Sequence, residues 1–131
     1  MKIFLTGGTG FVGSHFLDAA LKKGYHVKAL IRPKSKFKIF QKQNLEWLRK
    51  ELCEINLSDL KGYNAVVHLA AEGVSPKLSS WERCYSFNVI ESLGFIKKAI
   101  DINIKKIIIT GSFAEYGKSA LKYDFIPTDA P

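Results

Sequence analysis

The segment Thr6–Gly13, with the sequence TGGTGFVG, constrains the fold more than any other part of the chain. It follows the apolar run Lys2–Leu5, which has the length and composition of a buried β-strand, and it leads into an amphipathic run at Phe11–Lys23. Its second, third and fourth glycines match the G-x-G-x-x-G pattern, in which glycines allow a tight turn, close approach of a pyrophosphate and close packing of helix on strand. We therefore predict a dinucleotide-binding unit, and the alternative is a glycine-rich turn without a ligand.

The residues after the second predicted strand, Val27–Ile31, favour the phosphorylated form of the cofactor. A fingerprint that binds NAD carries a carboxylate about 20 residues further on, which accepts a hydrogen bond from the ribose 2′-hydroxyl. At this place the chain has Arg32, followed by Lys34, Ser35 and Lys36. A guanidinium can stack on adenine and hold a 2′-phosphate with two parallel hydrogen bonds. The sequence therefore predicts NADP as the cofactor, with NAD as the alternative.

Short apolar runs alternate with longer amphipathic runs, a pattern typical of a parallel sheet covered by helices. We predict strands at five places: Lys2–Leu5, Val27–Ile31, Leu45–Arg49, Ala65–Leu69 and Lys106–Thr110. The fold class is therefore α/β, a Rossmann-type doubly wound parallel sheet with about five strands, incomplete at its carboxyl end. Without repeats or linkers, residues 1–131 are expected to form one dinucleotide-binding domain.

Two longer helices are predicted from apolar residues at helical spacing. In the first, Phe11–Lys23, the residues expected on the buried face are Val12, Phe16, Ala19 and Ala20. In the second, Trp81–Ile102, the residues expected to share a face are Cys84, Phe87 and Ile90.

The composition fits a domain without disulfides, metal or membrane spans. Hydrophobic residues make up 47% and charged residues 24% of the 131 residues, which excludes disordered and collagen-like chains. Cys53 and Cys84 are too few for a disulfide framework and too far apart for a zinc site, so we expect reduced thiols and a cytoplasmic protein. The three histidines are dispersed, and no run approaches the roughly 20 apolar residues of a membrane span.

Positive charge is concentrated in one stretch of the chain. The net charge is +8, and residues 19–45 contain eight lysines and arginines but no acidic residue. An evenly basic surface would indicate nucleic acid, whereas a concentrated one indicates a single anionic group or a solvated helix face. For Lys38 and Lys42 we favour the solvated helix. We expect no nucleic-acid partner, and steeply salt-dependent affinity for a duplex would support that alternative.

Four sequence features together resemble the extended short-chain dehydrogenases/reductases, of the NAD-dependent epimerase/dehydratase type that acts on nucleotide sugars. They are the glycine pattern of residues 6–13 followed by Ser14 and His15, the run His68–Ala71, Asn88 in the long helix, and Ser112–Gly117. The resemblance runs nearly from end to end. Together with the basic residues after the second strand, it implies a dinucleotide site formed by Gly7, Gly8, Thr9, Gly10, Phe11, Val12, Gly13, Arg32, Lys34, Ser35, Lys36, Glu51, Leu52, Leu69, Ala70, Ala71, Asn88 and Thr110.

The resemblance also implies roles within this site. Ala70–Ala71 would line the ribose, Asn88 would brace the helix below the site, and Glu51–Leu52 would lie beside adenine. Ser112 would be the catalytic hydroxyl that faces the substrate. Physical reasoning agrees, because ligands of open parallel sheets bind beyond the carboxyl ends of strands, where a hydroxyl can donate to a substrate carbonyl. The alternative for Ser112 is a serine that only forms a turn.

The Tyr-x-x-x-Lys pair of this family is absent, because none of the five tyrosines has a lysine four residues later. Such a lysine helps a phenol act as general acid and base. The last residues, Ile126–Pro131, resemble the loop that precedes the pair in the family. We therefore expect a truncated protein without its substrate domain, and little turnover by the chain itself.

These features predict the cofactor-binding part of an NAD(P)-dependent reductase or epimerase for nucleotide sugars, in the synthesis of surface polysaccharide precursors. Relatives that eliminate water carry an acid two positions after the catalytic hydroxyl, where this chain has Ala114. Glu115 is expected to point to the opposite face of an extended segment. The alternatives are a nucleotide-sugar dehydratase and a non-catalytic, redox-sensing NADP module. The full-length protein is expected to be a homodimer.

Overall fold

Five parallel strands form one sheet in the computed structural model, which describes residues 1–74 and 79–129. The strands are β1 (Lys2–Thr6), β2 (His26–Ile31), β3 (Leu45–Arg49), β4 (Ala65–His68) and β5 (Lys106–Ile109). Their order is β3-β2-β1-β4-β5, so the chain starts in the middle, winds to one edge and then crosses to the other. This is the order of a doubly wound Rossmann sheet. The predicted fold class is confirmed, and each strand ends within one residue of its predicted bounds.

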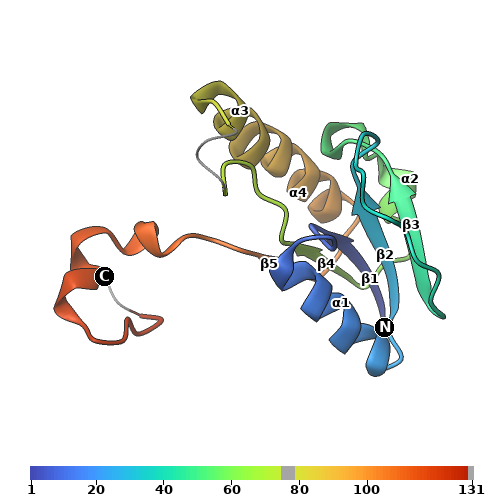
Figure 1. The fold of residues 1–131 in the computed structure, drawn as a ribbon, viewed down its shortest axis with the longest axis horizontal. Coiled ribbons are helices and arrows are strands. Elements are labelled where there is room, and N and C mark those ends of the chain that lie inside the picture. The colour runs from blue at the N-terminus through green and yellow to red at the C-terminus, as the bar shows by residue number, and fades with distance from the viewer. Residues whose placement is uncertain (75–78, 130–131) are drawn as a thin grey trace.

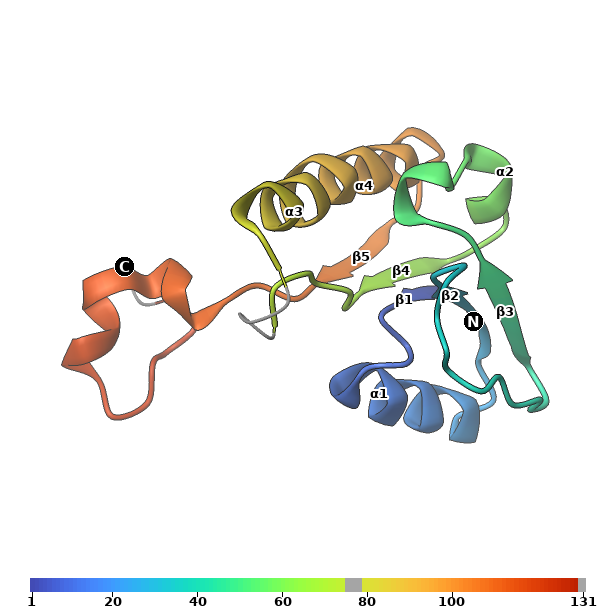
Figure 2. The same cartoon turned by 45° about the horizontal axis from the view of Figure 1, so that its top comes forward.

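Helices cover both faces of the sheet. Helix α1 (Phe11–Lys22) lies on one face, and α2 (Leu57–Leu60), α3 (Trp81–Tyr85) and α4 (Ser92–Asp101) lie on the other (Figures 1 and 2). A 3-10 turn, Leu52–Glu54, precedes α2. The segment after β5 contains a 3-10 helix at Phe113–Lys122 and extends away from the sheet (Figure 1). No helix within the described ranges 1–74 and 79–129 is long and apolar enough to cross a membrane.

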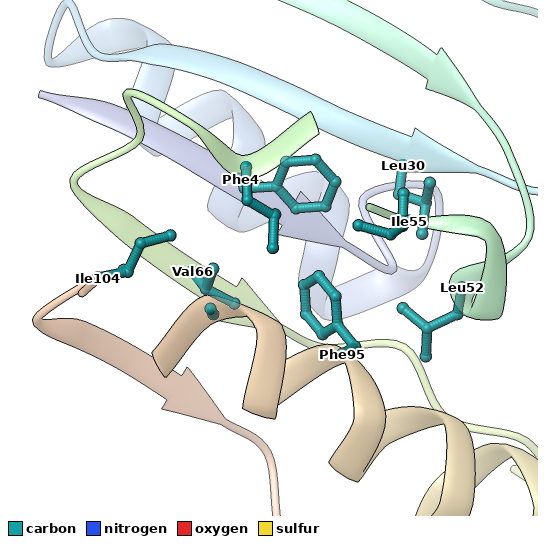
Figure 3. Packing of buried hydrophobic residues seen from close by; sticks show 9 residues of the cluster. Phe4, Leu30, Leu52, Ile55, Val66, Phe95 and Ile104 are labelled. Atoms are coloured by element: carbon teal, nitrogen blue, oxygen red, sulfur yellow. The ribbon is translucent and has the colours of Figure 1, made fainter. Parts of the chain in front are cut away.

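Alternate residues of β1, β2, β3 and β4 pack in two separate cores, as the two-residue period of a strand requires. On the α4 side, Phe4 of β1 and its register partner Val66 of β4 pack with Phe95 (Figure 3). The rings of Phe4 and Phe95 lie 5.7 Å apart between centroids. On the α1 side, Leu5 and Val67 pack with Leu17.

The buried face of α1 differs from the predicted one. Its buried residues are Gly13, Leu17 and Ala20, whereas Val12 is 60% exposed and Ala19 is also exposed. The prediction placed the apolar side chains of the first turn inward. That turn lies against the backbone of the glycine loop, so its buried residue is Gly13, which has no side chain.

The long helix contains a π-helical turn that the sequence did not reveal. Residues Ser86–Glu91 form this turn between α3 and α4. A π-helical turn holds more residues than an α-helical one, so the side chains beyond it rotate relative to those before it. Cys84 and Phe87 are therefore half-buried, while Ile90 is 59% exposed, and the prediction that these three share a face is wrong.

Candidate functional site

The carboxyl ends of β1, β4 and β5 lie side by side. Thr6 is the register partner of His68, and His68 is the register partner of Ile109. The next residues along each strand, among them Gly7 and Thr110, therefore leave the sheet at one edge. The Thr110 N–H donates to the His68 carbonyl at 3.2 Å. Most of the predicted site residues follow these strand ends, where open parallel sheets bind their ligands.

The glycine loop between β1 and α1 presents a helix end without a side-chain cap. Gly7 has a φ of +73°, and its carbonyl accepts the Gly10 N–H at 2.9 Å, which closes the turn. Gly10 is the N-cap residue, and neither a side-chain cap nor an acidic residue occupies the first turn of α1. The partial positive charge of the helix end and the N–H groups of its first turn are thus directed at the space beyond the loop. These donors fit a pyrophosphate.

The loop packs too closely for side chains. A Cβ on Gly13 would overlap the carbonyl oxygen of Gly7 and meet the Gly8 Cα at 2.9 Å. A Cβ on Gly7 would lie 2.7 Å from the Ala70 nitrogen. The sequence-predicted residues of the loop and of the segment after β4 are therefore in direct backbone contact.

The turn after β2 is fixed by a residue that the sequence analysis missed. Arg49, at the end of β3, donates from Nη1 to the carbonyls of Arg32, Pro33 and Ser35, at 3.3, 2.9 and 3.4 Å. Because these carbonyls converge on one guanidinium, the turn that carries Arg32 and Lys34 has a defined position at the end of β2. The Arg32 and Lys34 side chains are exposed. The only signal in the sequence was a basic residue that ends the neighbouring strand.

Residues 32–44 do not form a helix, so the expectation of a solvated helix face is wrong. An aromatic cluster holds this segment instead: the rings of Phe37 and Phe40 lie 5.6 and 5.7 Å from that of Trp47. Trp47 Nε1 also donates to the Phe40 carbonyl at 3.0 Å. Lys42 pairs with Asp18 of α1 at 3.0 Å. Pro33 and the tertiary contacts of the aromatic rings outweigh the helix propensity of the lysines.

The predicted adenine-side pair, Glu51 and Leu52, has two different environments. Glu51 is the N-cap residue of the 3-10 turn and is half-buried. Leu52 is 2% exposed and belongs to the core on the α4 side. The Leu52 side chain is therefore not available to a ligand.

Asn88 connects the π-helical turn to the segment after β4. Its Oδ1 accepts the Glu72 N–H at 2.8 Å, and its Nδ2 donates to the Glu72 carbonyl at 2.9 Å. This two-way contact ties the helix to the segment after β4. Leu69 and Ala70 lie on the same segment and are partly buried, while Ala71 is exposed.

His68 lies at the end of β4 and is buried, with 3% of its surface exposed. Its Nδ1 lies 2.7 Å from Thr6 Oγ1, and its Nε2 lies 2.9 Å from Ser92 Oγ. Burial lowers the pKa of His68, because the charged imidazolium loses its hydration. From the sequence, Thr6 and His68 were recognised only as parts of motifs, and Ser92 was not recognised. The available signal is a polar residue that ends each of two otherwise apolar strands.

Ser112 begins the 3-10 helix that follows β5. Its Oγ accepts the Ala114 N–H at 3.2 Å, and its N–H donates to Glu115 Oε1 at 2.9 Å. The hydroxyl proton is not used by this cap. The segment is helical, so the expectation that Glu115 points to the opposite face of an extended segment is wrong. Glu115 folds back onto Ser112 because this reciprocal cap satisfies donors at the helix start.

The described residues 1–74 and 79–129 contain no group of three or more His, Cys, Asp or Glu side chains that could hold a metal ion. Part of the concentrated positive charge is neutralised within the fold. Lys22 and Lys42 both pair with Asp18, at 2.7 and 3.0 Å, and Lys28 pairs with Glu46 at 3.1 Å.

Comparisons with known proteins give matches over nearly the whole chain. A family model described as "NAD dependent epimerase/dehydratase family" matches residues 3–130. The chain is 30% identical over 119 residues to the "Putative dihydroflavonol 4-reductase" of Synechocystis sp. (strain ATCC 27184 / PCC 6803 / Kazusa), covering 87% of this chain and 33% of that protein. It is 30% identical over 125 residues to the CDP-abequose synthase of Salmonella muenchen, covering 95% of this chain and 41% of that protein.

A solved structure, MoeE5 in complex with UDP-glucuronic acid and NAD, is similar in fold and sequence. The TM-score is 0.74 and the identity 26%, and the match covers 89% of this chain and 38% of that one. The chain thus spans between 33% and 41% of the length of these three proteins.

Proposed function

Because this chain belongs to the NAD dependent epimerase/dehydratase family, we propose that it binds a nicotinamide dinucleotide with the pyrophosphate at the glycine loop Gly7–Gly13. The observation that carries the proposal is the uncapped start of α1, packed without side chains against the segment after β4. The bound nicotinamide would supply hydride transfer. The protein contributes the N–H donors, the helix dipole and the position of the strand ends.

The dinucleotide we propose is NADP, with NAD as the alternative. No carboxylate follows β2, where a residue that binds the ribose 2′-hydroxyl would lie. Arg32 and Lys34 are exposed there, on a turn that Arg49 holds. Ser35 Oγ accepts the Phe37 N–H at 3.2 Å and keeps its own proton for a phosphate oxygen. A guanidinium, an ammonium and a hydroxyl on one fixed turn suit a dianionic 2′-phosphate.

The parent reaction we propose is reduction or epimerisation of a nucleotide-linked sugar. The relative in Salmonella muenchen is a CDP-abequose synthase, and MoeE5 is described with UDP-glucuronic acid, so both names contain nucleotide sugars. In this chain Ser112 follows β5 with a free hydroxyl proton, which can orient a substrate carbonyl for hydride transfer. Ala114 offers no acid for the elimination of water. The missing acid–base Tyr and Lys would follow Pro131 in the parent protein.

We also propose that the parent protein is a cytoplasmic homodimer. The two cysteines of the described residues, Cys53 and Cys84, are unpaired, as expected in a reducing compartment.

The dimer is supported by a stripe of exposed apolar side chains along α3, the π-helical turn and α4, spaced so that they share one face. Their exposed fractions are 88% for Trp81, 61% for Tyr85, 59% for Ile90, 62% for Leu93 and 60% for Ile100.

Calorimetric titration of this chain with NADP⁺ and with NAD⁺ tests the cofactor proposal. We expect saturable binding of both, with NADP⁺ bound more tightly. Absence of binding for both dinucleotides would contradict the proposed function, and tighter binding of NAD⁺ would contradict only the NADP preference. The parent protein, incubated with NADPH and a panel of nucleotide-linked keto sugars, then tests the proposed reaction.

A further inference from the structure

Three polar side chains are buried in the described part of the chain, and one of them contacts the other two. They are Thr6 of β1, His68 of β4 and Ser92 of α4, which are 0%, 3% and 6% exposed. Burying polar groups is costly unless each one finds a hydrogen-bond partner, and no buried side-chain nitrogen or oxygen of the described residues lacks one. This cluster is therefore a connected network that passes through His68.

The two ends of the network fix the direction of every hydrogen bond in it. At one end the Ala70 N–H donates to Thr6 Oγ1 at 3.2 Å, and at the other end Ser92 Oγ donates to the Phe87 carbonyl at 2.8 Å. The Thr6 hydroxyl must then donate to His68 Nδ1, because the network contains no other acceptor for the Thr6 proton. Because the Ser92 hydroxyl donates to the Phe87 carbonyl, Ser92 Oγ must accept a hydrogen bond from His68 Nε2. Only a neutral imidazole with the proton on Nε2 satisfies both contacts.

The other forms of the ring leave groups without partners. A proton on Nδ1 alone would point at Thr6 and leave the Thr6 hydroxyl proton without an acceptor. Nε2 and Ser92 Oγ would then face each other without a proton between them. The doubly protonated ring would likewise leave the Thr6 proton unused. The Phe95 ring, with its centroid 5.5 Å from that of His68, offers no counter-charge.

One end of the network fixes the π-helical turn. Ser92 donates both its N–H and its hydroxyl to the Phe87 carbonyl, which is the five-residue step that defines the turn. The same turn presents Asn88 to the backbone of Glu72. The shape of the helix below the site thus depends on a side chain that contacts His68.

The other end holds the segment after β4 against the glycine loop. Ala70 N, which donates to Thr6, lies where a Cβ on Gly7 would come within 2.7 Å. The proximity of these two backbones determines where Leu69–Ala71 lies relative to the helix end of the loop. Thr6 itself is the residue that immediately precedes the loop.

We propose that His68 is a positioning residue of the dinucleotide site, held as the neutral Nε2–H tautomer in a one-way hydrogen-bond chain from the Ala70 N–H to the Phe87 carbonyl. The chain couples the π-helical turn to the backbone that borders the glycine loop. This inference rests on the proposed function in one respect: the segment Leu69–Ala71 would lie beside the bound dinucleotide. The tautomer and the coupling are properties of the chain without any ligand.

The first test is the tautomer of His68 in the ligand-free chain. Long-range ¹H–¹⁵N correlation of histidine-labelled protein at pH 7.5 is expected to show one ring, absent in His68→Gln, with a fixed proton on Nε2 and a proton-free Nδ1. A ring that carries its proton on Nδ1, averages between tautomers or is doubly protonated would overturn the proposal.

The second test measures coupling along the chain by hydrogen exchange of the Ala70 amide. Ser92→Ala leaves the direct Ala70–Thr6 contact intact, yet we expect exchange at Ala70 to become about five-fold faster relative to the Val27 amide of β2. The matched control is Ser86→Ala. It removes a hydroxyl from the same π-helical turn, but that hydroxyl donates to Glu91 and does not contact His68. Unchanged exchange in Ser92→Ala, or an equal effect of Ser86→Ala, would overturn the coupling.

Dinucleotide affinity separates the two proposals. If His68 has the expected tautomer and coupling but the chain binds no dinucleotide, only the proposed function fails. If the chain binds a dinucleotide but His68 is not the neutral Nε2–H tautomer, only the proposed role of His68 is refuted.

Discussion

Gly13 packs directly on the backbone of Gly7, so that a Cβ on Gly13 would overlap the Gly7 carbonyl oxygen. That carbonyl also accepts the Gly10 N–H at 2.9 Å, which closes the loop. The first turn of α1 is therefore locked onto the residue that follows β1. This contact directs the free N–H groups of the helix start toward the edge where β1, β4 and β5 end.

We therefore expect Gly13→Ala to destabilise the chain by about 1–3 kcal/mol, the usual cost of overpacking, and to weaken dinucleotide binding. The matched control is Gly94→Ala in α4, where a Cβ would meet no atom within 4 Å. There the substitution should stabilise the chain by about 0.5–1 kcal/mol, since alanine loses less entropy in a helix. Urea denaturation of both variants provides the measurement. Equal effects would show that the Gly7–Gly13 contact does not decide the loop geometry.

The sheet was predictable because its determinants are local. Buried parallel strands are short, largely apolar runs, and β1, β2 and β4 carry that signal within their own residues. The glycine loop was predictable because its pattern follows a strand and opens a helix. The position of the loop at the strand ends then follows from topology alone.

Two of the features that escaped prediction depend on residues outside the segments concerned. The π-helical turn at Ser86–Glu91 is tied to His68 through Ser92, so no periodicity within the helix reveals it. The segment 32–44 is shaped by Trp47 and by Arg49, which lie on β3. The contact of Glu115 with Ser112 is local instead, and it escaped prediction because this segment was expected to be extended rather than helical.

Arg32→Ala is expected to weaken NADP binding by about 1.5–3 kcal/mol, the range for a hydrogen bond to a charged group. NAD binding should change little, because NAD has no 2′-phosphate. Lys38→Ala, in the same basic segment and also exposed, serves as the control that should leave both affinities near their original values. Calorimetric titration of the unmodified chain, Arg32→Ala and Lys38→Ala measures both affinities. An equal loss of affinity for NAD and NADP in Arg32→Ala would argue against a contact between Arg32 and the 2′-phosphate.

The exposed stripe of α3 and α4 predicts self-association through its central residues. Leu93→Asp places a charge in the middle of the stripe and should shift the parent protein from dimer to monomer in sedimentation velocity. Leu57→Asp alters an exposed leucine of α2, outside the stripe, and should leave the dimer intact. A parent protein that sediments as a monomer, or a Leu93→Asp variant that remains dimeric, would refute this interface.

The stability of the chain should fall below neutral pH because of His68. Burial lowers its pKa in the folded state, whereas in the unfolded chain the ring has its ordinary value of about 6.5. Between these two values the unfolded state binds more protons, so the free energy of unfolding is highest above about pH 6.5 and decreases as the pH falls below it. One proton gives a slope of at most about 1.4 kcal/mol per pH unit. Urea denaturation at pH 7.5, 6.5, 5.5 and 5.0 measures this slope.

His68→Gln removes this titration and should flatten the slope between pH 6.5 and 5.0, although the variant is less stable at every pH. Asp59 acts in a lower pH range than His68. Burial acts to raise the pKa of Asp59, but the Asn56 N–H and the Lys50 ammonium outweigh it and lower that pKa, so its contribution is lost only below about pH 3.8. If the wild type and His68→Gln have the same slope, His68 is not held neutral by the fold.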